Sequence, residues 1–251
     1  MEILGNKYKR NLLIIMFLLF YYHFCFGENN FNTIDDKIEF YKNRYNVNCL
    51  NEKITDNFGN GFDALYGTRN MRTILYGIAY RGGANNFYHK VCKRDNHNPL
   101  PGDGLINLSN EGFSNAVYLY PTNYDEALHE VINPGNGDTL KYLNLTGSGR
   151  KTFRAVMELV RDAIKNKDKG PIYFHCWNGW HQSGLISSVI LMQFCGYSPG
   201  KAYDYWLENT DGINKGYKKI KNEIISFKPF DDISIDESLK QKICPCEKKD
   251  K

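Results

Sequence analysis

The fold of this chain is decided by a short polar loop between two apolar segments. The loop and its flanks read His175-Cys176-Trp177-Asn178-Gly179-Trp180-His181-Gln182-Ser183-Gly184. The run that leads into the loop, residues 172–174, is continuously apolar, which is typical of a short strand buried in a parallel sheet. The run that follows, residues 183–194, has the pattern of an apolar helix ended by Gly196. This order of strand, loop and helix predicts an α/β fold.

The segments upstream support the same fold class. A helix is predicted over residues 151–166, because apolar side chains recur there at the spacing of one buried helix face. Strand-like segments occur at residues 71–81, 105–108, 116–120 and 140–145. Strands and helices therefore alternate along the chain.

Cys176 is the residue of the loop with the clearest chemical potential. Its thiol follows a buried strand and precedes a helix N-terminus, where backbone N–H groups and the helix dipole favour negative charge. The same N–H groups could bind a phosphate or another oxyanion, and Gly179 permits the tight curl that points successive amides inward. Ser183 is placed to donate to a thiolate or to cap the helix.

The loop resembles the signature loop of the cysteine-dependent protein phosphatases, the tyrosine and dual-specificity superfamily. That signature is His-Cys, five residues, Arg, then Ser or Thr, with Gly third among the five. The matches in register are His175, Cys176, Gly179, Ser183 and Gly184. Weaker similarity extends from about residue 70 to about residue 225, and includes the segment 80–83.

The resemblance implies a central, mostly parallel sheet flanked by helices, with the loop at the C-terminal end of a strand. It makes Cys176 the candidate nucleophile, Ser183 its hydroxyl partner and His175 a hydrogen-bonding residue beneath the loop. The anion-binding residues that it implies are Trp177, Asn178, Gly179, Trp180, His181 and Gln182. No cofactor and no metal are expected.

Gln182 occupies the position at which the family uses an arginine to hold the phosphate. Glutamine offers N–H donors but neither a charge nor a planar fork. Losing a buried, charge-assisted contact of that kind costs about 2–5 kcal/mol, which corresponds to roughly tens- to thousands-fold in rate. The substitution therefore predicts a weakened or altered grip on phosphate.

The general acid is a second departure. The family places an aspartate after the strand that precedes the long helix, whereas here residues 146–149 read Thr-Gly-Ser-Gly. Asp138 is the nearest upstream carboxylate and a possible general acid, although it precedes the predicted strand. Asp211, in a later loop, is the other candidate.

The loop also admits plainer interpretations. His181 could supply positive charge, because histidine titrates near neutrality, or it could pack outward while Trp177 and Trp180 fill the core. Cys176 itself could be a small buried hydrophobe without reactivity. The five matches in register favour the nucleophile.

The N-terminus has the pattern of a secretory signal peptide. Three basic residues precede the apolar run 12–20, and Gly27 offers a small residue at a cleavage site. An uncleaved membrane anchor is the alternative, and only in that case would the protein contact a membrane. The predicted organisation is a signal peptide at 1–27, a polar N-terminal extension at 28–69, a phosphatase-like domain at 70–230 and a charged tail with Cys-Pro-Cys at 231–251.

Composition excludes several classes of protein. A formal net charge of +4 among 32 basic and 28 acidic residues argues against a nucleic-acid partner, and a mean hydropathy of -0.52 argues against repeated membrane spans. Export would permit disulfides. The set predicted to form them is Cys49, Cys92, Cys244 and Cys246, with Cys195 in the core. Their spacing matches no zinc-ligand pattern.

Three functions fit these observations. The first is an exported phosphatase-like enzyme that uses Cys176 on a phosphoester. The second is a pseudophosphatase that binds a phosphorylated or anionic ligand, or a protein partner, without turnover. The third is thiol chemistry on a substrate that contains no phosphate.

Overall fold

The computed structural model describes residues 31–85 and 99–246, and it confirms the predicted α/β fold. A six-stranded sheet has the order β1-β2-β6-β3-β5-β4. The strands are β1 (Thr68–Leu75), β2 (Ala79–Ala84), β3 (Asn115–Tyr118), β4 (Glu130–Ile132), β5 (Thr139–Asn144) and β6 (Ile172–Cys176). The four central strands are mutually parallel, whereas β1 and β4 run antiparallel at the two edges. The predicted signal peptide and Cys92 lie outside the described residues.

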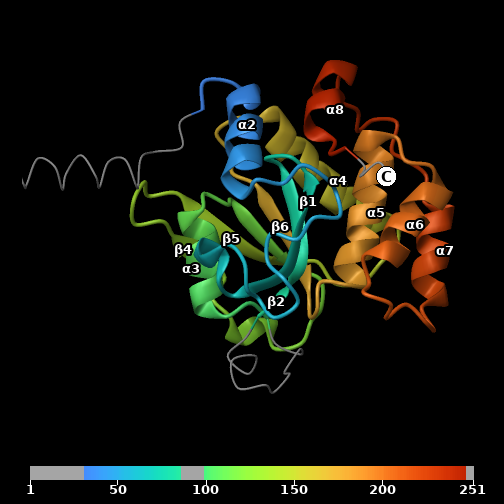
Figure 1. The fold of residues 1–251 in the computed structure, drawn as a ribbon, viewed down its shortest axis with the longest axis horizontal. Helices are drawn as coiled ribbons and strands as arrows, with labels where there is room; N and C mark the ends of the chain where they lie inside the picture. Colours follow the sequence, from blue (N-terminus) through green and yellow to red (C-terminus); the bar gives the residue numbers. More distant parts are fainter. Residues whose placement is uncertain (1–30, 86–98, 247–251) are drawn as a thin grey trace, which may run out of the picture.

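Helices cover both faces of the sheet (Figure 1). They are α2 (Ile34–Tyr45), α3 (Gly102–Asn110), α4 (Arg150–Lys165), α5 (Gln182–Cys195), α6 (Pro199–Glu208), α7 (Lys218–Ser226) and α8 (Glu237–Ile243). The buried side chains of α4 to α8 belong to one apolar cluster, and those of α3 belong to the other. Successive residues of a strand face opposite sides of a sheet, so Phe174 of β6 joins the first cluster while Tyr173 joins the second.

Two local predictions have different outcomes. The long helix predicted at 151–166 is α4, and its buried face is the predicted one. Residues 105–108 were expected to form a strand but lie within α3, where Leu105 and Leu108 are one helical turn apart and both buried. A short apolar run fits either structure, because its length alone does not separate a strand from a helix.

The segment before β1 packs closely on the rest of the protein. Thr33 and Asp36 form a reciprocal capping box at the start of α2. Tyr41 and Tyr45 of this helix are buried in the same cluster as α3. Lys37 is buried as well, and its ammonium donates to the carbonyl oxygen of Ala163, at 2.9 Å, near the end of α4. The domain boundaries at residues 69 and 230 stay predictions.

One disulfide joins Cys195, the last residue of α5, to Cys244, directly after α8. This corrects the expectation that Cys195 is a plain core residue. The sequence could not show that α8 folds back onto the end of α5, which places the two Cα atoms 5.8 Å apart. Cys49 and Cys246 lie opposite each other on neighbouring backbone segments, where the N–H of Leu50 donates to the Cys246 carbonyl.

The helices of residues 31–85 and 99–246 include none with the length and apolar character that a membrane span requires.

The disulfide predicts a measurable loss of stability in Cys244→Ser. The bond encloses a segment with a sequence separation of 49, and removing such a cross-link lowers the free energy of unfolding by about 2–4 kcal/mol. Urea denaturation under non-reducing conditions measures this difference. Gln241→Ser, an exposed position of α8 three residues earlier, is the matched control and should change stability much less. Equal stability of Cys244→Ser and the wild type would contradict the prediction.

Candidate active site

Cys176 lies at the C-terminal end of β6, at the centre of the sheet. Strands β2 and β3 flank β6 on either side, and all five residues of β6 are buried. The chain then curls through residues 177–181 and enters α5. The Sγ atom of Cys176 lies 3.4 Å from the Oγ atom of Ser183, and both residues are buried. The structure thus brings together the predicted thiol and hydroxyl.

His175 supports the loop from below. Its Nε2 atom lies 2.8 Å from the hydroxyl of Tyr142, which itself accepts a hydrogen bond from the Leu100 amide. Nδ1 lies 3.2 Å from the Cys176 carbonyl oxygen. Because a carbonyl oxygen only accepts, the neutral imidazole carries its proton on Nδ1, and Nε2 accepts from the Tyr142 hydroxyl. Burial lowers the pKa of His175 to about 3. His175 is neutral at physiological pH and acts as the predicted hydrogen-bonding residue, not as an acid or base.

The carbonyl groups of the loop all point away from its interior. The Trp177 carbonyl accepts from the Ala84 amide at 3.1 Å. The Asn178 and Gly179 carbonyls each accept from the side-chain amide of Asn70, at 3.2 Å. In a trans peptide the N–H points opposite to the C=O. The N–H groups of residues 178 and 180 therefore point away from Ala84 and Asn70, as the donors of an oxyanion-binding loop do.

Two glycine positions permit this arrangement. Gly179 has a φ of +76°, in the left-handed region that favours glycine. Gly83, at the end of β2, touches the loop so closely that an added Cβ would lie 2.5 Å from the Trp177 carbonyl oxygen and 2.6 Å from the Gly179 nitrogen. The segment 80–83, whose sequence resembles the family only weakly, thus packs directly against the loop through Gly83.

Gln182 faces a tyrosine. Its side chain hydrogen-bonds to the hydroxyl of Tyr120, whose pKa is raised mainly by burial. Tyr120 stacks on Trp177 with ring centroids 4.5 Å apart, and the indole N–H of Trp177 donates to Tyr118. A neutral amide and a neutral phenol therefore occupy the side of the loop where the family places its arginine.

His181 does not supply the positive charge that was considered for it. Its ring stacks on Tyr217 with centroids 3.8 Å apart, and its Nε2 atom lies 2.6 Å from the Ile213 carbonyl oxygen. Burial lowers the pKa of His181 below its usual value, an effect larger than the opposing hydrogen bond to Ile213. The imidazole is therefore neutral at neutral pH.

Neither aspartate that was considered as the general acid is suited to that role. Asp138 directly precedes β5, and because β5 and β6 run in the same direction, it lies at the opposite edge of the sheet from Cys176. This corrects the expectation for Asp138. Asp211 accepts hydrogen bonds from the indole of Trp180, at 2.9 Å, and from Asn57, at 2.7 Å. Burial raises its pKa, but the hydrogen bonds from Asn57 and Lys53 outweigh burial and lower it overall, so Asp211 is ionised.

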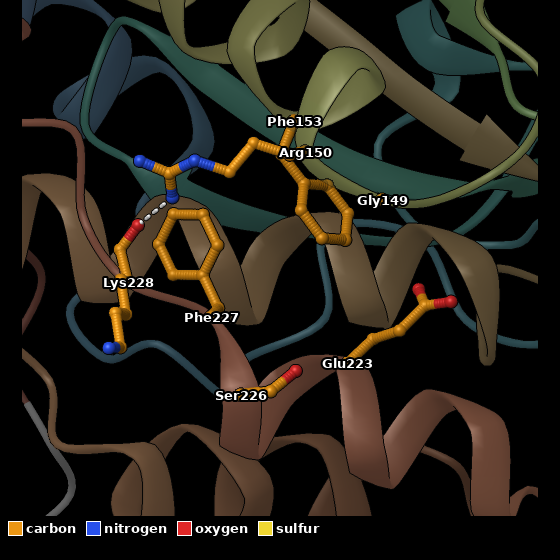
Figure 2. Close-up of a pocket in the computed structure, with 7 residues that line it drawn as sticks. All are labelled: Gly149, Arg150, Phe153, Glu223, Ser226, Phe227 and Lys228. Carbon is orange, nitrogen blue, oxygen red and sulfur yellow. Dashed lines mark hydrogen bonds between the residues drawn. The ribbon is translucent and has the colours of Figure 1, made fainter.

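The loop at residues 146–149, where the family places its general acid, hydrogen-bonds to a carboxylate from another helix. Ser148 donates to Glu223 of α7 at 2.6 Å. Glu223 also lines a cavity of about 290 Å³ between the start of α4 and the end of α7 (Figure 2). The other residues that line it are Gly149, Arg150, Phe153, Ser226, Phe227 and Lys228. Sequence reasoning missed Glu223, because nothing in the local pattern of α7 relates it to residue 148.

The comparisons with known proteins concern the fold. No protein-family model and no curated protein matches the chain. The core catalytic domain of the PP-IP phosphatase SIW14 from S. cerevisiae, in complex with citrate, is 16% identical, with 68% of this chain and 89% of that chain covered and a TM-score of 0.41. A second structure of the Siw14 catalytic core is also 16% identical, with 68% of this chain and 88% of that chain covered and a TM-score of 0.41. P. aeruginosa TpbA is 14% identical, with 62% and 86% covered and a TM-score of 0.40.

The chain has an α/β fold with a mostly parallel sheet, and the loop that contains Cys176 joins β6 to α5. Similarity at these TM-scores carries no further argument.

The contact between β2 and the loop predicts that Gly83→Ala is destabilising. The new Cβ would press on the backbone of residues 177–179, and overpacking of this kind costs about 1–3 kcal/mol. Thermal unfolding measures the effect. Gly200→Ala is the matched control, because a Cβ at Gly200 meets nothing within 4 Å. An unchanged melting temperature in Gly83→Ala would show that the loop does not lie against β2 as described.

The buried imidazole predicts a pH dependence of stability. The pKa of His175 is about 3 in the folded protein and about 6.5 in an unfolded chain. The folded state therefore binds fewer protons between these values, so stability is lost as the pH falls from about 6.5 toward 3. His175→Gln should show a shallower loss between pH 6.5 and 4. The exposed-site control His129→Gln should follow the wild type, and identical slopes for all three proteins would refute the prediction.

Proposed function

We propose that this protein binds a phosphoryl group in the loop 176–182 and uses Cys176 as a nucleophile on a phosphoester. The observation that carries the proposal is the pairing of the Cys176 thiol with the Ser183 hydroxyl, 3.4 Å apart, inside a loop whose carbonyls are bonded from behind. That arrangement supports both a thiolate and a bound oxyanion.

The chemistry follows from the geometry. The Cys176 thiolate attacks phosphorus, a P–S bond forms, and the P–O bond to the leaving group breaks. Water then attacks phosphorus, which releases inorganic phosphate and returns the thiolate. The amides of the loop hold the non-bridging oxygens, and the Ser183 hydroxyl stabilises the departing sulfur. Residues 146–149 contain no carboxylate to protonate the leaving group, so we expect substrates with good leaving groups to react best.

A binding function without turnover is the second candidate. It is supported by the neutrality of the groups around the loop, namely the Gln182 amide, the Tyr120 phenol and the His181 imidazole. An anion would then be held by the backbone amides of the loop alone, with no charged side chain beside it. The ligand in either case is a phosphorylated or otherwise anionic molecule.

We also propose that the protein is exported. The basic and apolar pattern of residues 1–27 supports this. The Cys195–Cys244 disulfide supports it too, because such bonds persist in oxidising compartments.

Hydrolysis of a generic aryl phosphate tests the catalytic proposal. We expect slow turnover by the full chain that Cys176→Ser abolishes. We expect Gln182→Arg to raise the rate by roughly ten- to a thousandfold, because it restores a bidentate charged contact.

The matched control for the arginine variant is Gln241→Arg, which adds the same charge on the exposed side of α8. It should leave the rate unchanged. Turnover by the wild type equal to that of Cys176→Ser, with no gain in Gln182→Arg, would exclude the enzyme and favour the binding function.

A further inference from the structure

Arg81 lies behind the loop, and no role for it was predicted from the sequence. It belongs to β2 and its side chain is fully buried. One terminal nitrogen, Nη2, donates to the carbonyl oxygens of Gly179 and Trp180, the latter at 3.1 Å. The other, Nη1, donates to the hydroxyl of Tyr205 at 3.3 Å. Among the described residues, no carboxylate lies within 4.0 Å of this guanidinium.

The lack of a nearby carboxylate matters because a buried cation must be compensated. Here the compensation comes from the carbonyl ends of two loop peptides. A positive charge at the carbonyl end of a peptide draws electron density toward it and makes the N–H at the other end a stronger donor. The N–H groups of Trp180 and His181 belong to those two peptides.

Asn70 acts on the same loop from the neighbouring strand. It is fully buried, and it has a φ of +51°, a left-handed conformation that few residues other than glycine adopt. Its amide nitrogen donates to the Asn178 and Gly179 carbonyls, while its amide oxygen accepts from the Arg72 guanidinium. A second buried arginine is therefore connected to the loop through one side-chain amide.

We propose that Arg81, assisted by Asn70, is the positioning residue of this site. Its charge acts through the loop peptides and performs part of the task of the family's signature arginine, which is replaced here by Gln182. The guanidinium charge of Arg81 lies outside the loop, on the side of its carbonyl groups, rather than within it. It strengthens the N–H donors that face the Cys176 thiolate and a bound oxyanion. This inference rests on the proposed function, since it assigns the source of positive electrostatics for that same loop.

The proposal accounts for two features together. Gln182 and His181 are both neutral at neutral pH, so the interior of the loop carries no cation of its own. The carbonyls of residues 177–180 nevertheless all accept hydrogen bonds from outside the loop. The buried guanidinium of Arg81, bonded to two of them, supplies both orientation and charge.

The test measures the reactivity of Cys176 rather than turnover. The rate of alkylation of Cys176 by iodoacetamide, followed on the peptide that contains it by mass spectrometry, is recorded against pH for the full chain. The same reaction with increasing inorganic phosphate gives the dissociation constant for phosphate from the protection of the thiol. Arg81→Met removes charge and donors, Arg81→Lys retains the charge without the fork, and Asn70→Ala removes only the amide.

We expect the pH midpoint of alkylation to rise by about one unit or more in Arg81→Met, and phosphate protection to weaken about tenfold, as expected when hydrogen bonds that support a charged group are lost. Arg81→Lys should recover part of both effects. Asn70→Ala should show a smaller shift in the same direction. If Arg81→Met does not fold, Arg81→Lys and Asn70→Ala still decide the question.

The control separates positioning from stability. Ser188→Ala removes a buried hydroxyl of α5 that donates to the Ala202 carbonyl, away from the loop. It should lower the melting temperature without moving the alkylation midpoint. Arg81 and Asn70 variants that lose stability yet keep the wild-type midpoint and phosphate affinity would overturn the proposal. An expected shift in midpoint without any hydrolysis of aryl phosphate would leave this inference standing and refute the catalytic function instead.

Discussion

The close approach of β2 to the loop after β6 is the constraint on which the rest of the site depends. Gly83 has no side chain, so the backbone of β2 lies directly against residues 177–179. This contact allows Ala84 to bond to the loop backbone. It also brings Arg81, from the same strand, within reach of two further carbonyls. One strand thus determines the direction of most peptides in the loop.

Charge is distributed unusually around Cys176. The side chains of Gln182, His181 and Tyr120 around the loop are neutral, whereas the cations Arg72 and Arg81 are buried on its β2 side. Arg72 illustrates the electrostatic cost of this arrangement, since burial, followed by the nearby charge of Arg81, lowers its pKa to about 10. Asp211 offsets part of that charge at 3.9 Å from Arg72, and Trp180 connects Asp211 back to the loop. Asp211 therefore partly neutralises Arg72.

The parts of the molecule that the sequence predicted well are those set by local pattern. The strand before Cys176, the helix after it and the buried face of α4 follow from apolar spacing and from glycine and proline at the ends. The roles of Arg81, Asn70 and Cys195 do not, because each depends on a partner about 50 to 110 residues away. The prediction that Asp138 is the general acid was wrong for a related reason. Its distance from Cys176 is set by the parallel direction of β5, which only the sheet order reveals.

The disulfide between α5 and α8 also makes residues 196–243 a covalently closed loop. The segment at residues 211–217 lies within this loop and is largely exposed. A protease that cuts there would leave two fragments still joined through sulfur. The end of α8 would stay hydrogen-bonded to the turn after β1, through the Ile243 carbonyl and the Tyr76 amide. A nicked protein would therefore migrate as one species until it is reduced, and α5 would keep its C-terminal attachment.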